Sequence, residues 1–110
     1  MSDDVLSRLA SVIRVRRAAD ADSSYTRKLL DGGPERCAKK LGEEAVELII
    51  AAAAEDDASV KAEAADLLYH LIVLLEARGI ALDDVLQVLE GRMGTSGLEE
   101  KASRADRAKP

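Results

Sequence analysis

Apolar side chains recur along this chain at the three- and four-residue spacing of helices, and no segment keeps a strand-like alternation for more than a few positions. Residues 4–19 place apolar side chains on one face and arginines on the other, which indicates an amphipathic helix. A short helix is expected around residues 27–30, and Gly32, Gly33 and Pro34 then form a stop-and-restart signal. The pattern predicts an all-α fold.

Two long helices follow, over about residues 34–54 and 60–78. Residues 55–59 interrupt the helical pattern, and Ser59 is the expected N-cap of the second long helix. Gly79 is a suitable residue to end that helix, because glycine tolerates the left-handed conformation that follows a helix C-terminus. The two long helices are therefore separated by only a few residues, which favours antiparallel packing.

The rest of the chain predicts one more helix, over residues 80–93, with acidic residues in its first turn. Residues 94–110 are charged and rich in Ala and Ser, which is typical of a flexible tail. We therefore expect one domain over residues 1–93, built as a bundle of four to five helices. Because the segment 67–75 is apolar almost all round in a short chain, we expect a second copy to complete the bundle as a homodimer.

Two acidic pairs stand out in the long helices, Glu44 with Glu47 and Glu63 with Asp66. Residues three apart are neighbours on one helix face, and the first pair borders the apolar face of its helix. Packed antiparallel, the two helices would aim four carboxylates at one point, where like charges repel. A hard divalent cation with oxygen ligands is the natural counter-charge. The spacing alone leaves a second interpretation open, in which the acids are surface charges paired with lysines.

The composition of the chain argues against several classes of function. The chain has 110 residues, a formal net charge of −5 and only two aromatic residues, both tyrosines, which argues against a nucleic-acid binder. The single cysteine, Cys37, excludes an internal disulfide and fits a reducing compartment. The longest apolar run, 71–75, is far too short to cross a bilayer, and no signal-peptide core follows the acidic start. We expect a cytoplasmic protein that does not bind membranes.

Several motifs occur together and in order between residues 24 and 93. They are Ser24-Tyr25-Thr26, Lys28-Leu29-Leu30, Gly33-Pro34-Glu35, Lys39-Lys40-x-Gly42-Glu43-Glu44-Ala45-Val46-Glu47, Glu63-x-Ala65-Asp66-Leu67-Leu68-Tyr69-His70 and Ala77-Arg78-Gly79. This region resembles the phosphoribosyl-ATP pyrophosphatase family, which belongs to the MazG-like all-α NTP pyrophosphohydrolases. The resemblance implies four-helix units that dimerise and bind Mg²⁺.

Carried onto this chain, the resemblance implies that Glu44, Glu47, Glu63 and Asp66 are the Mg²⁺ ligands. Glu43 would be a further ligand, a base that orients water, or a group that supports the ligands, so the implied catalytic acids are Glu43, Glu44 and Glu47. The implied reaction converts 1-(5-phosphoribosyl)-ATP into 1-(5-phosphoribosyl)-AMP and pyrophosphate, the second step of histidine biosynthesis. No protein nucleophile is needed.

Three lysines are candidates for phosphate binding: Lys28, Lys39 and Lys40. Lys40 lies on the same stripe of its predicted helix as Glu44, so it is the best placed of the three. For each lysine, an ordinary solvated side chain is the competing interpretation. His70 shares the stripe of Glu63 and Asp66, but a single histidine on a buried helix is more often a hydrogen-bonded core residue.

Three other functions compete with this one. A house-cleaning pyrophosphatase acting on non-standard dNTPs would use the same metal site. A di-iron carboxylate bundle would require Glu-x-x-His pairs, and the chain has one histidine. A non-catalytic helical dimerisation module would show no dependence on Mg²⁺. The chain has no room for a fused cyclohydrolase domain, so a stand-alone enzyme is expected.

Overall fold

The computed structural model describes residues 4–20 and 24–93, which form five α-helices and contain no β-strand. The predicted all-α class is therefore confirmed for the described residues. The predicted tail, residues 94–110, lies outside them.

The first two helices begin where short polar side chains cap them. Helix α1 covers Val5–Arg16, and the Asp4 carboxylate accepts a hydrogen bond from the backbone N–H of Ser7 at 2.7 Å. Helix α2 covers Tyr25–Asp31, and the Ser24 hydroxyl accepts one from the backbone N–H of Arg27 at 3.1 Å. Such caps satisfy N–H groups that have no partner within the helix.

The two long helices are α3, Gly33–Ala54, and α4, Asp57–Ala77. Gly33 has a φ of +81°, and Pro34 follows in the first turn of α3, as the stop-and-restart signal predicted. Gly79, with a φ of +71°, follows the end of α4. Both glycines adopt a left-handed conformation that other residues rarely tolerate.

The predicted start of α4 was wrong by three residues. Asp56, not Ser59, is the N-cap, because its carboxylate accepts a hydrogen bond from the backbone N–H of Ser59 at 2.9 Å. Several polar residues in succession offer a cap here, and the side-chain oxygen that reaches the free N–H decides between them. The connection between α3 and α4 consists of Glu55 and Asp56 alone.

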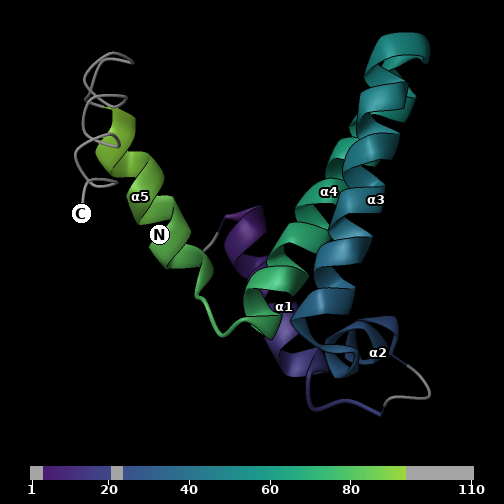
Figure 1. Ribbon diagram of the computed structural model, residues 1–110. Coiled ribbons are helices and arrows are strands. Elements are labelled where there is room, and N and C mark those ends of the chain that lie inside the picture. Colours follow the sequence, from purple (N-terminus) through teal and green to yellow (C-terminus); the bar gives the residue numbers. More distant parts are fainter. Residues whose placement is uncertain (1–3, 21–23, 94–110) are drawn as a thin grey trace, which may run out of the picture.

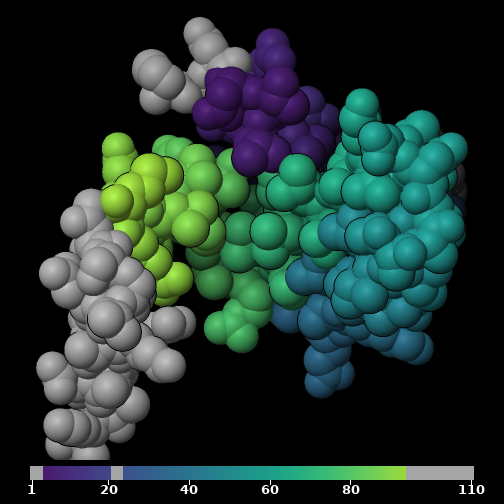
Figure 2. Space-filling view, turned by 90° about the horizontal axis from the view of Figure 1, so that it is seen from above, coloured from purple at the N-terminus to yellow at the C-terminus, as the bar shows by residue number. Residues whose placement is uncertain are grey.

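Helices α3 and α4 lie side by side as an antiparallel hairpin, and this pair makes the most extensive contact between elements (Figure 1). Helix α2 crosses the lower end of the hairpin (Figure 1). Helix α1 packs along α4 (Figures 1 and 2). We call this lower end, where α1 and α2 pack, the base. We call the part of the hairpin that extends past the base, residues 46–65, the arm.

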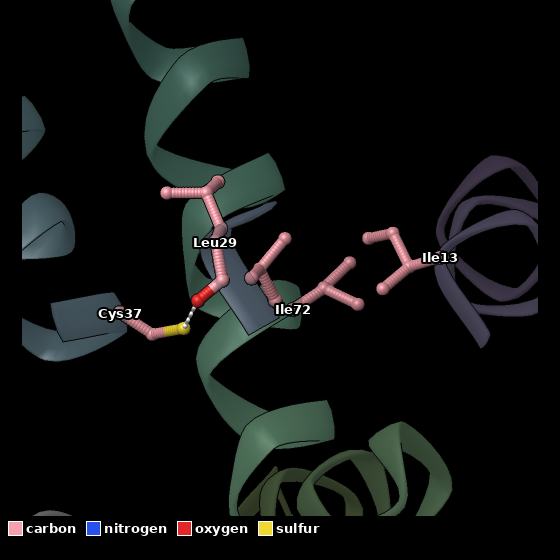
Figure 3. Close-up of a cluster of buried hydrophobic side chains, with 5 residues drawn as sticks. Ile13, Leu29, Cys37 and Ile72 are labelled. Atoms are coloured by element: carbon pink, nitrogen blue, oxygen red, sulfur yellow. Dashed lines mark hydrogen bonds between the residues drawn. The ribbon is translucent and has the colours of Figure 1, made fainter. Parts of the chain in front are cut away.

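The core lies in the base, where four helices each contribute apolar side chains. Its buried residues are Ile13, Leu29, Cys37, Ile72 and Val73. Figure 3 shows Ile13 on α1 directed toward Ile72, while the Cys37 thiol donates a hydrogen bond to the Leu29 carbonyl at 3.2 Å. Burial raises the pKa of the Cys37 thiol, so it behaves as a small packed residue.

Polar contacts join α2 and the C-terminal end of α1 to α4 at the base. The hydroxyls of Thr26 on α2 and Tyr69 on α4 share a hydrogen bond. The Glu76 carboxylate accepts from Arg17 at 2.6 Å and lies 3.6 Å from Arg14. Part of the arginine face of the first helix therefore docks that helix onto α4 rather than only facing water.

Helix α5 covers Leu82–Met93 and begins two residues later than predicted. It stands apart from the hairpin in Figure 1 and has no buried residue. Among the described residues, no helix combines the length and apolar character that a bilayer crossing requires.

Candidate metal and nucleotide site

The antiparallel packing of α3 and α4 brings three carboxylates together. One ligand oxygen each from Glu44, Glu63 and Asp66 lies within 4.8 Å of the others, and no second group of this kind occurs in residues 4–20 and 24–93. Glu44 is 6% exposed, Glu63 is half-buried and Asp66 is exposed. The group therefore has one buried side and one side open to solvent, which a ligand requires.

Glu63 is the least favourably placed carboxylate of this group, because one of its oxygens lacks a hydrogen-bond partner within residues 4–20 and 24–93 and it lies near like charges. Its Oε1 atom is buried and has no hydrogen-bond partner among the described residues. Desolvation raises the pKa of Glu63, and the neighbouring charges of Glu47, Asp66 and Glu44 raise it further. A cation placed among these oxygens would supply both the missing partner and the missing counter-charge.

The donor set fits a hard divalent cation. All three side chains offer carboxylate oxygens, which Mg²⁺ binds while it keeps further positions for water and phosphate. Soft ligands are absent, because the described cysteine is in the base core with its thiol directed to the Leu29 carbonyl. The residues present therefore fit the ion that the sequence resemblance implies.

Lys40 is the cation that faces this acidic group. Its ammonium lies 3.5 Å from a Glu44 oxygen and 3.7 Å from a Glu43 oxygen. The phenolate that Tyr25 forms at high pH is the largest cause that raises the pKa of Lys40, followed by the hydrogen bond and charge of Glu44. One lysine does not balance this many carboxylates, so the site stays strongly acidic.

The four predicted metal ligands do not all occupy equivalent places. Glu47 is exposed and lies outside the close group of three, although it is near enough to raise the pKa of Glu63. Glu43 is also exposed, and it lies on the side of Lys40 that faces a cavity. The structure thus places Glu47 at the edge of the acidic group and Glu43 between that group and the cavity.

The cavity has a volume of about 650 Å³ and lies between α2 and the first turns of α3. Tyr25 and Leu29 line it from α2, and Lys39 and Lys40 line it from α3. Lys28 is exposed on α2 and is not one of the lining residues. Two of the three predicted phosphate-binding lysines therefore face the cavity.

Sequence reasoning missed one cation of this cavity, Arg36. It lies three and four residues before Lys39 and Lys40, so all three share one face of α3. The sequence shows this spacing directly. The sequence does not show that α2 forms a wall opposite this face of α3, and only that wall makes the face part of a cavity.

His70 lies beneath the cavity wall. It is 6% exposed, and its ring meets those of Tyr69 and Tyr25 edge to face, with centroid separations of 4.9 and 6.3 Å. Burial lowers the pKa of His70, and the Nδ1 atom is buried without a hydrogen-bond partner in the described part of the chain. The buried position expected of His70 is confirmed.

Comparison with known proteins finds relatives that match most of the chain. A family model described as phosphoribosyl-ATP pyrophosphohydrolase matches residues 6–93. The chain is 58% identical over 100 residues to a phosphoribosyl-ATP pyrophosphatase of Cereibacter sphaeroides, covering 91% of this chain and 97% of the relative. It is 59% identical to one of Dinoroseobacter shibae, covering 91% and 98%. It is 60% identical over 98 residues to phosphoribosyl-ATP pyrophosphatase 1 of Bradyrhizobium diazoefficiens, covering 89% and 92%.

Proposed function

The chain belongs to the phosphoribosyl-ATP pyrophosphohydrolase family and is a hydrolase, and we propose that it acts on 1-(5-phosphoribosyl)-ATP in histidine biosynthesis. Water attacks the α-phosphorus. The bond between this phosphorus and the oxygen that bridges it to the β-phosphate breaks, and the bridging oxygen leaves with pyrophosphate. The products are 1-(5-phosphoribosyl)-AMP and pyrophosphate, and the proton of the attacking water passes to a base. No side chain is consumed in this reaction.

The observation that carries the proposal is the group formed by Glu44, Glu63 and Asp66, with its unpartnered Glu63 oxygen. These three residues would hold Mg²⁺, with Glu47 at the edge of the group as the fourth ligand. When bound, Mg²⁺ neutralises charge on the pyrophosphate leaving group and lowers the pKa of a bound water. Without a cation, a polyphosphate would be repelled by these carboxylates.

The other residues of the site act on the substrate and the water. Lys40, held beside Glu44 at 3.5 Å, is placed to bind the phosphate chain next to the acidic group. Lys39 adds a second cation on the cavity wall. Glu43 lies outside the close group and 3.7 Å from Lys40, which favours a role in orienting water and accepting its proton. For Lys28, phosphate binding remains a prediction from the sequence.

A homodimer is the second part of the proposal. Val46, Ile49 and Ile50 on the arm are 54%, 66% and 52% exposed. Apolar side chains this close together on one helix are expected to be covered, and in a short chain a second copy is the available partner. The arm would then be the part of each copy that the other one covers.

Steady-state kinetics test the function. We expect a higher kcat/KM for 1-(5-phosphoribosyl)-ATP than for any member of a dNTP panel, and no turnover when Mg²⁺ is chelated. Glu47→Gln and Asp66→Asn should lower kcat by about 100-fold or more, since even residues that support a metal ligand contribute about 10- to 100-fold. Glu90→Gln on the exposed face of α5 is the matched control and should leave kcat unchanged.

Each alternative function gives a different result in the same assays. A preference for a non-standard dNTP would identify a house-cleaning pyrophosphatase. A non-catalytic module would hydrolyse no nucleotide, and its melting temperature would not respond to Mg²⁺. Full activity of Asp66→Asn would contradict the proposed ligand set.

A further inference from the structure

The proposed substrate carries anionic groups at two separate places, the triphosphate and the 5-phosphate of the added ribose. From the cavity next to the acidic group, and resting on the proposed function, we infer that Arg36 and Lys39 bind this second phosphate, a phosphomonoester dianion. The acidic group and Lys40 are left for the triphosphate. The cavity would then select a substrate with a phosphate at its far end.

Charges along one face of α3 change sign in a way that suits such a substrate. The first turns carry Arg36, Lys39 and Lys40, and the following turns carry the carboxylates of Glu43 and Glu44. With a rise of 1.5 Å per residue, the positions of Arg36 and Glu44 are separated by about 12 Å along the helix. Arg36 is therefore set apart from the metal group along the helix, whereas Lys40 contacts Glu44 within it.

The cations of the cavity differ in their partners. Lys40 is engaged by Glu43 and Glu44, whereas Arg36 and Lys39 form no ion pair with any described residue. Glu35, the other acid of the cavity wall, is not within ion-pair distance of either. Two unpaired cations at one end of a cavity are available to a dianion, and charge-assisted hydrogen bonds to phosphate are among the stronger contacts in proteins.

The turn between α2 and α3 leaves room for the Arg36 side chain. A Cβ atom built at Gly32 would clash with Cδ of Arg36 and would lie 3.0 Å from its Cβ. The aliphatic part of the Arg36 side chain therefore lies directly over Gly32, in space that a Cβ at that position would enter. The planar guanidinium of an arginine can bind phosphate through two hydrogen bonds.

Tyr25 supplies an apolar surface in the same cavity. Its side chain is 54% exposed, and its ring is braced edge to face against the buried His70. A purine stacks on an exposed aromatic face whatever its substituents are. Tyr25 thus offers a place for the base, while Lys40 and Arg36 reach the phosphates.

A pair of substrates tests the inference: 1-(5-phosphoribosyl)-ATP and the same compound lacking the 5-phosphate, 1-ribosyl-ATP. Wild-type enzyme should have a lower KM for the phosphorylated substrate. Arg36→Gln should raise that KM by about 10- to 100-fold, the loss expected for a hydrogen bond to a charged group. Its kcat, and its KM for 1-ribosyl-ATP, should stay within about twofold of wild type, since the triphosphate contacts are unchanged.

Matched variants separate this contact from general charge effects. Arg8→Gln on α1 removes the same charge from an exposed position outside the cavity and should change neither KM. Lys39→Gln should resemble Arg36→Gln with a smaller effect. Arg36→Lys should recover only part of the affinity, because lysine keeps the charge but not the paired geometry.

Equal KM values for the two substrates in wild type, or an equal rise for both in Arg36→Gln, would overturn the inference. The proposed hydrolysis would survive that result. Conversely, if neither substrate is hydrolysed, the proposed function fails. Calorimetric titration of both compounds into Glu47→Gln and into the same variant with Arg36→Gln, which does not depend on turnover, then still decides whether Arg36 recognises the 5-phosphate.

Discussion

The base and the arm are made from the same two helices, yet they are stabilised in different ways. In the base, α1 and α2 cover α3 and α4, and Ile13, Leu29 and Ile72 are each at most 3% exposed. In the arm, the two long helices cover only each other, and Ile49 is 66% exposed. A helix pair alone buries one stripe of each helix, so its outer stripes need another partner.

The acidic group lies where these two regions meet. Glu44 is buried between the helices, while the Glu63 oxygen has no partner in the described chain. The base thus provides rigid support from packed apolar side chains, and the arm leaves room for ligands and a second copy. The comparison indicates that stability comes from the base, and that the acidic group lies at its junction with the arm.

The largest effect is expected from truncating the base core. Ile72→Ala removes a fully packed side chain that contacts α1 and should lower the free energy of unfolding by about 2–5 kcal/mol. Urea denaturation followed by circular dichroism measures this loss. Since small domains are stable by only about 5–15 kcal/mol, the variant should be clearly destabilised at all protein concentrations. A loss below about 1 kcal/mol would contradict the assignment of the core to the base.

A smaller and different effect is expected on the arm. Ile49→Ala should change the unfolding of the separated monomer by less than about 0.5 kcal/mol, as exposed substitutions usually do. It should weaken association of two copies by about 1 kcal/mol or more if Ile49 lies in the interface. Sedimentation equilibrium of wild type and variant measures the association constant. An unchanged association constant would remove Ile49 from the dimer interface.

The smallest effect is expected where base and arm meet. In metal-free protein, Glu63→Gln should raise the melting temperature slightly, because it removes one like charge from Glu47, Asp66 and Glu44. Added Mg²⁺ should raise the melting temperature of wild type, since it binds only the folded state, and should have little effect on the variant. Glu90→Gln is the control and should respond to Mg²⁺ as wild type does. A metal-free variant less stable than wild type would contradict the repulsion argument.

The sequence by itself determined most of the local structure. Helical spacing predicted the elements, and Gly33, Pro34 and Gly79 marked helix ends that the structure confirms. These features depend on backbone conformation and on hydrogen bonds a few residues apart, which a sequence shows directly. Even so, the start of α4 was misplaced, because neighbouring polar residues compete for one cap and only the folded structure shows that Asp56 makes it.

Spacing also predicted which acids share a helix face, but not which of them meet across the two helices. Only the axial register and rotation of α3 against α4 decided that Glu44, Glu63 and Asp66 converge while Glu47 stays at the edge. The same holds for the cavity, where α2 folds back over α3 and places Tyr25 near Arg36. Contacts between helices depend on packing among many side chains at once, so the tertiary structure, rather than any local pattern, fixes the geometry of this site.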